Sequence, residues 1–141
     1  MKENPVFPII DLHCDLLAYL AMQEGATPYD LDGIGAAIPH LQSGNVKLQV
    51  CAIFSLTEGG SSKFGMQQAE IFRDLHREGH FQYWNRDTDW ETVQSETKPY
   101  ILPAIENASA FSEENESIEE SLYRLEILMA TCGRPLYITM T

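Results

Sequence analysis

Four short apolar runs stand out in the pattern of hydrophobic and polar positions along the chain. They cover residues 6–12, 46–54, 100–105 and 136–140. Each run is bounded by proline, glycine or polar residues, a pattern typical of buried β-strands. We therefore predict four strands at these positions.

Between the runs, apolar residues recur at the spacing of amphipathic helices. Such stripes occupy residues 16–21, 69–75 and 118–132, and Gly25, Gly79 and Gly133 follow them where a helix end is expected. The third stripe gives the strongest prediction, because Ser117 and Glu120 have the spacing of a capping box. Its predicted apolar face consists of Ile118, Leu122, Leu125, Met129 and Cys132.

Two segments lack a clear period. Residues 29–44 are rich in aspartate, glycine and proline, which predicts a long loop. Residues 81–98 mix aromatic and polar side chains and are predicted to form a packed connector. The remaining elements alternate as β-α-β-α-β-α-β, an order that indicates an α/β fold with a parallel sheet.

Composition narrows the possible functions. The chain has 141 residues, a formal net charge of −12 and a sequence pI near 4.5. This acidic balance disfavours a nucleic-acid partner, and three cysteines are too few for a disulfide framework. The apolar run near the N-terminus is too short for a signal peptide core or a membrane span. We expect a cytoplasmic protein that binds neither nucleic acid nor membrane.

Candidate chemistry lies where two predicted strands end. His13 and Asp15 follow the first run at i and i+2, a spacing that places two side chains on the same side of a strand. Glu106 follows the apolar run of residues 101–105, where a carboxylate is costly without a cation. Imidazole and carboxylate groups are ordinary zinc ligands. Each alone is also explained by a helix cap or a salt bridge, but their occurrence at two strand ends favours a metal site.

Several segments around these residues together resemble one family. Residues 9–17 contain Asp-x-His-x-Asp, residues 38–49 lead into the second strand, and residues 102–108 end in Glu106 and small residues. Residues 121–141 supply a helix and a strand that reads Tyr-Ile-Thr-Met-Thr. In order and spacing these segments resemble the membrane (renal-type) dipeptidase family of metallopeptidases.

The resemblance implies a (β/α)₈ barrel of the TIM type that hydrolyses dipeptides with two zinc ions. His13 and Asp15 match ligands of one zinc, and Glu106 matches the carboxylate that bridges both. The family's remaining ligands, two histidines and an aspartate, have no counterpart in this sequence. The chain thus corresponds over residues 1–141 to the N-terminal portion of such a barrel, with an incomplete site and weak or absent activity alone.

Length supports that interpretation, because such a barrel takes about 250 residues and about four strands make half of it. A half-barrel leaves unpaired strand edges, so we expect a homo-oligomer joined through them. The alternative is a non-catalytic half-barrel remnant or binding module in which His13, Asp15 and Glu106 are purely structural.

Other polar groups have simpler interpretations. His76 and His80 flank a predicted helix end and lack metal-binding spacing. Cys14, Cys51 and Cys132 lie on apolar elements and are predicted to be small core residues.

Overall fold

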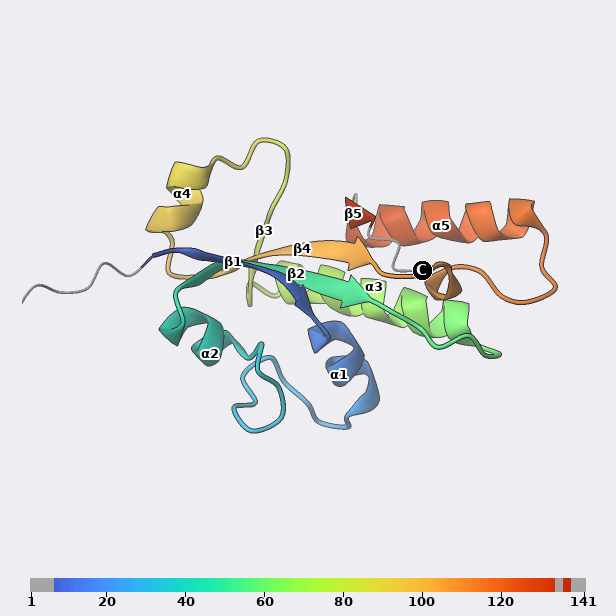
Figure 1. Ribbon diagram of the computed structural model, residues 1–141, viewed down its shortest axis with the longest axis horizontal. Coiled ribbons are helices and arrows are strands. Elements are labelled where there is room, and N and C mark those ends of the chain that lie inside the picture. Colours follow the sequence, from blue (N-terminus) through green and yellow to red (C-terminus); the bar gives the residue numbers. More distant parts are fainter. Residues whose placement is uncertain (1–6, 134–135, 138–141) are drawn as a thin grey trace, which may run out of the picture.

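Parallel strands form a single sheet in the computed structural model, which describes residues 7–133 and 136–137 (Figure 1). The strands found there are β1 (Ile9–Cys14), β2 (Val46–Ile53), β3 (Gln82–Tyr83), β4 (Tyr100–Ile105) and β5 (Leu136–Tyr137). Their order is β1-β2-β4, and the far side of β4 is shared by β3 at its beginning and β5 at its end. All the described pairings are parallel, as the α/β prediction requires.

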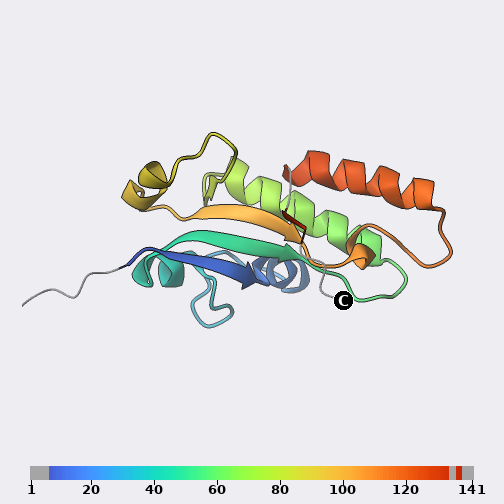
Figure 2. The same cartoon turned by 45° about the horizontal axis from the view of Figure 1, so that its top comes forward.

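Helices connect the strands. They are α1 (Leu16–Met22), α2 (Ile38–Ser43), α3 (Ser61–Arg77), α4 (Trp90–Ser95), the short 3₁₀ helix η1 (Ala108–Ala110) and α5 (Ile118–Cys132). Figures 1 and 2 show α3 lying between α1 and α5, and it contacts both. No helix in the described part of the chain is both long and apolar enough to cross a membrane.

The main core lies between the sheet and the row formed by α1, α3 and α5. Alternate residues of β2 and β4 enter it, including Cys51, Ile53, Ile101 and Ile105. The opposite face of the sheet is covered near the beginning of the strands, where α4 packs. That smaller cluster contains Leu48, Trp84, Trp90, Val93, Tyr100 and Leu102.

Most of the predicted elements are confirmed. The predicted strands at 46–54 and 100–105 correspond to β2 and β4, and the three helical stripes correspond to α1, α3 and α5. The capping box is present, since the Ser117 hydroxyl accepts a hydrogen bond from the Glu120 amide and the Glu120 carboxylate accepts one from the Ser117 amide. Such caps satisfy amide groups that have no partner within the helix.

Other expectations were wrong in part. The first strand runs over Ile9–Cys14 instead of 6–12, and it is largely exposed because no described strand pairs with its outer edge. Residue 6 and the predicted strand residues 138–140 lie outside the described residues. The predicted loop at 29–44 contains α2, and the packed connector at 81–98 contains β3 and α4.

The apolar face of α5 also differs from the prediction. Ile118 and Leu122 are 74% and 53% exposed, whereas Leu128 and Cys132 are buried. The C-terminal half of the helix therefore packs against α3, while its first turns present apolar side chains to solvent.

Candidate metal centre

The end of β1 is shaped by a β-bulge. Asp11 and Cys14 pair with Gln49 and Cys51, so one extra residue of β1 is accommodated between two ladder positions. The Asp11 carboxylate accepts a hydrogen bond of 3.0 Å from the His13 amide, which holds the bulge. Bulges commonly redirect side chains near functional sites.

Asp15 occupies the N-cap position of α1. Its carbonyl oxygen accepts a hydrogen bond from the Tyr19 amide, but its side chain makes no capping hydrogen bond. The carboxylate instead lies beside the imidazole of His13, with 3.5 Å between Oδ1 and Nε2. Both side chains are more than half exposed, at 55% for His13 and 63% for Asp15. An incoming ion therefore has access to both.

Glu106 follows β4 directly. Its backbone amide donates a hydrogen bond of 3.0 Å to the carbonyl of Ile53, which ties the end of β4 to the end of β2. The next residue strengthens this connection, because the Asn107 side-chain amide donates to the carbonyl of Ser55 and its oxygen accepts from the Ser55 amide. The backbone at Glu106 and Asn107 is thus tied to the end of β2 and the residues after it.

A buried glutamine fixes the end of β2 in the same way. Gln68 of α3 is fully buried; its Nε2 donates to the Phe54 carbonyl at 2.7 Å, and its Oε1 accepts from the Phe54 amide at 3.2 Å. The side chain replaces the partners that β2 loses where its ladder ends. Nothing in the local sequence pattern identified this role, because it depends on the packing of α3 against the sheet.

Across the end of β2, the side chains from β1 and β4 meet. One ligand atom each of His13, Asp15 and Glu106 lies within 4.8 Å of the ligand atoms of the other two. A tetrahedral metal with bonds of about 2.1 Å separates its ligands by about 3.4 Å, close to the 3.5 Å between His13 and Asp15. The donor set of one nitrogen and two carboxylates suits a divalent cation.

No other group of three or more His, Cys, Asp or Glu side chains in residues 7–133 lies close enough together to hold a metal ion. The structure therefore brings all three sequence-predicted residues together, although they come from strands that are not neighbours. Their role as ligands stays a prediction.

A cavity of about 260 Å³ adjoins β1. Its wall includes Asp11, His13, Cys14 and Gln49, together with the loop before α2. Gln49 is fully buried, and within the described structure its Oε1 has no hydrogen-bond partner. The sequence pattern predicted His13 as a ligand, whereas the contact of Asp11 with the His13 amide depends on the bulge.

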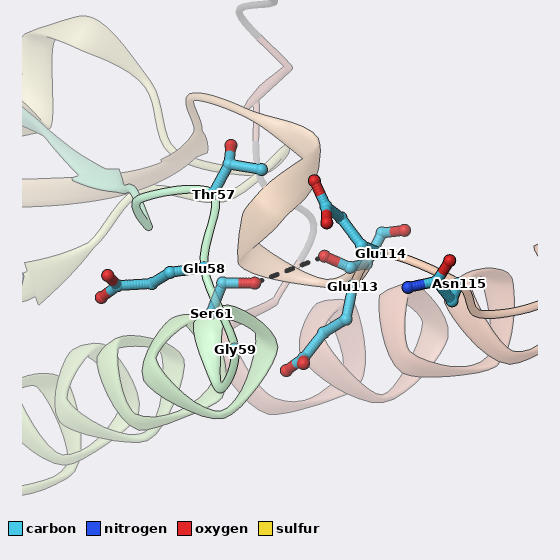
Figure 3. Close-up of a pocket in the computed structure, with 8 residues that line it drawn as sticks. Thr57, Glu58, Gly59, Ser61, Glu113, Glu114 and Asn115 are labelled. Atoms are coloured by element: carbon cyan, nitrogen blue, oxygen red, sulfur yellow. Dashed lines mark hydrogen bonds between the residues drawn. The ribbon is translucent and has the colours of Figure 1, made fainter.

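A second cavity, of about 250 Å³, lies between the loop after β2 and the segment before α5 (Figure 3). The carboxylates of Glu58, Glu113 and Glu114 point in different directions there and do not form a common cation site. Glu113 accepts hydrogen bonds from the Gly60 and Ser62 amides at the beginning of α3. The Ser62 hydroxyl also donates a hydrogen bond to Glu113. Together with the two amides, it lowers the pKa of the Glu113 carboxyl.

Two thiols, those of Cys14 and Cys51, lie on β1 and β2 next to the candidate centre. Cys14 donates a hydrogen bond to Cys51, with 3.8 Å between the sulfur atoms. This hydrogen bond and burial raise the pKa of Cys51 well above its usual range. Cys132 lies elsewhere, in α5, and burial raises its pKa to about 12. The prediction of core cysteines is confirmed for Cys51 and Cys132, whereas Cys14 is only partly buried.

Comparison of the chain with models of known protein families and with curated proteins found no match.

Proposed function

We propose that this chain is part of a metal-dependent hydrolase of the dipeptidase type, in which His13, Asp15 and Glu106 bind zinc. The observation that carries the proposal is the convergence of these side chains from β1 and β4 to within 4.8 Å. The site combines one imidazole with two carboxylates, a donor set that is ordinary for zinc. The resemblance to the membrane dipeptidases adds the substrate class, dipeptides.

The architecture supports a barrel as the parent fold. Along the sheet, β1, β2, β4 and β5 follow one another in sequence order, and α1, α3 and α5 share one face, while the short α4 packs only near the beginning of the strands on the other face. A doubly wound sheet distributes its connecting helices over both faces, whereas a (β/α)₈ barrel places them all outside. The candidate ligands follow the carboxyl ends of β1 and β4, where barrel enzymes carry their active sites.

Three protein ligands leave a coordination position for water, which is the arrangement of catalytic zinc sites. Zinc held by these residues would lower the pKa of a water molecule and supply a hydroxide nucleophile near neutral pH. Within the chain, the Asn107–Ser55 hydrogen bonds orient the backbone at Glu106, and the Asp11 carboxylate orients the backbone at His13. Because the resemblance implies further ligands that the sequence lacks, we propose weak or no dipeptide hydrolysis by the chain alone.

Metal analysis tests this proposal. Protein purified without chelator and dialysed against zinc should retain about one ion per chain, measured by elemental analysis. Glu106→Gln and His13→Ala should each weaken zinc binding at least about tenfold in a competition titration. Glu114→Gln is the matched control, because Glu114 is exposed and belongs to no metal-binding group among the described residues. Unchanged zinc affinity in Glu106→Gln would contradict the proposal.

A second candidate function, a non-catalytic half-barrel that associates with another copy, is favoured by the surface of β1. Phe7, Ile9, Ile10 and Leu12 are 47–73% exposed along this strand and the residues before it. Exposed apolar edge strands tend to pair with further strands. In light scattering after gel filtration, this function gives a mass above the 15.9 kDa of one chain, and a stable monomer would exclude it.

A further inference from the structure

Cys14 and Cys51 lie directly opposite each other on neighbouring parallel strands, as paired residues of the β1–β2 ladder. Adjacent strands are about 4.8 Å apart, within the range of 4.4–6.8 Å that disulfides span between Cα atoms. The sulfur atoms are already 3.8 Å apart and in contact through the thiol hydrogen bond. A disulfide bond of about 2.05 Å is therefore within reach of small side-chain rotations.

Access to the pair is asymmetric. Cys51 is fully buried, whereas Cys14 is partly buried and lines the cavity of about 260 Å³ beside β1. A small peroxide that enters this cavity reaches the Cys14 sulfur first, and Cys51 lies behind it. This is the arrangement of an accessible thiol with a resolving thiol next to it.

From this geometry we propose that Cys14 and Cys51 form a reversible redox site, in which hydrogen peroxide converts the two thiols into a disulfide that links β1 to β2. The Cys14 sulfur attacks one peroxide oxygen, the O–O bond breaks, and Cys14 becomes a sulfenic acid with release of water. The Cys51 sulfur then attacks the Cys14 sulfur and displaces the hydroxyl group, which leaves as water with the Cys51 proton. Two thiols lose two electrons and two protons in total, and one peroxide is reduced to two waters. A small dithiol reverses the reaction by exchange.

The site does not depend on the proposed metal centre, although it lies on the same strand. Cys132 provides an internal control, because it is buried in α5, where its thiol donates to the carbonyl of Leu128. Its thiol hydrogen bonds go to backbone carbonyls of α5 and the residue after it, and neither is to Cys14 or Cys51.

The experiment treats the full chain with a small excess of hydrogen peroxide and counts free thiols after denaturation. We expect a fall from three thiols to one, full recovery with dithiothreitol, and a non-reduced proteolytic digest in which the peptides of Cys14 and Cys51 are linked. Cys132→Ser should still lose two thiols and retain none. Cys51→Ala should form no intramolecular disulfide, and its Cys14 should be labelled by a reagent for sulfenic acids.

Thiol counting and the non-reduced digest of the unsubstituted chain test the proposal even if Cys51→Ala does not fold. Three free thiols after peroxide treatment would overturn the proposal, as would a disulfide that contains Cys132 or that links two chains.

Discussion

Gly65 of α3 offers a sharp test of how the segment after β4 is held in place. A Cβ atom at this position would lie 2.0 Å from the carbonyl oxygen of Ala110, and 2.7 Å from its carbonyl carbon and Cα. Ala110 is fully buried at the end of η1, four residues beyond Glu106. The helix backbone therefore packs directly against the segment that leads away from the candidate metal centre.

The size of the effect of Gly65→Ala follows from this contact. Carbon atoms essentially never approach closer than 3.0 Å, so α3 and η1 would have to separate by about 1 Å at a buried contact between two backbones. Overpacking of this kind costs about 3 kcal/mol at the upper end of measured values, while alanine gains about 1 kcal/mol over glycine within a helix. We expect a net loss of about 2 kcal/mol in the free energy of unfolding.

Urea denaturation followed by circular dichroism measures this loss. With a denaturant dependence of about 1.5–2 kcal/mol/M, the midpoint of Gly65→Ala should fall by roughly 1 M. Gly59→Ala is the control, because Gly59 has open space around its Cβ position and no positive φ, and its midpoint should stay within about 0.3 M. A Gly65→Ala midpoint equal to or above that of the unsubstituted chain would refute the close packing of α3 against η1.

Three other substitutions test individual contacts. Ser117→Ala removes the side-chain acceptor of the capping box and should lower the free energy of unfolding by about 1 kcal/mol in urea titration; no change would show that α5 begins without it. Gln68→Ala leaves the backbone amide and carbonyl of Phe54 without their side-chain partner. We expect the free energy of unfolding to fall by about 2 kcal/mol or more in the same assay, and an unchanged value would contradict this role. The Ser62 hydrogen bond lowers the pKa of Glu113 in the folded state. The stability that this hydrogen bond contributes is therefore fully present above the unfolded pKa of about 4.3, and it is lost as the pH falls through the lower folded pKa. Ser62→Ala should therefore lower the thermal midpoint at pH 6 more than at pH 3, and an equal loss at both pH values would contradict this linkage.

Local sequence signals predicted the elements whose environment is uniform along their length. The run that forms β4 is continuously apolar and was placed at Tyr100–Ile105, the same bounds as in the structure. The capping box at Ser117 was equally clear, since its two hydrogen bonds join residues only three positions apart. Such features need no knowledge of tertiary contacts.

Features that depend on distant neighbours were missed. The apolar residues of β1 were expected to be buried, but whether they are depends on a partner strand, and none is found among the described residues. On α5, Leu128 was overlooked in favour of Ile118 and Leu122, because periodicity alone does not show which part of a helix meets α3. The pairing of Cys14 with Cys51 depends on the bulge in β1, which shifts the register after Asp11.

The division of the candidate ligands between β1 and β4 has a consequence for the order in which the fold opens. His13 belongs to the strand at the edge of the sheet in the described residues and Asp15 follows it, whereas Glu106 follows a strand buried on both sides. Edge elements with solvent-facing backbone open at lower free energy than the central strands. In the proposed centre, an ion held by all three residues would therefore link β1 to β4 across β2. It would slow amide hydrogen exchange in β1 far more than in β4, because β4 is already held by strands on both sides.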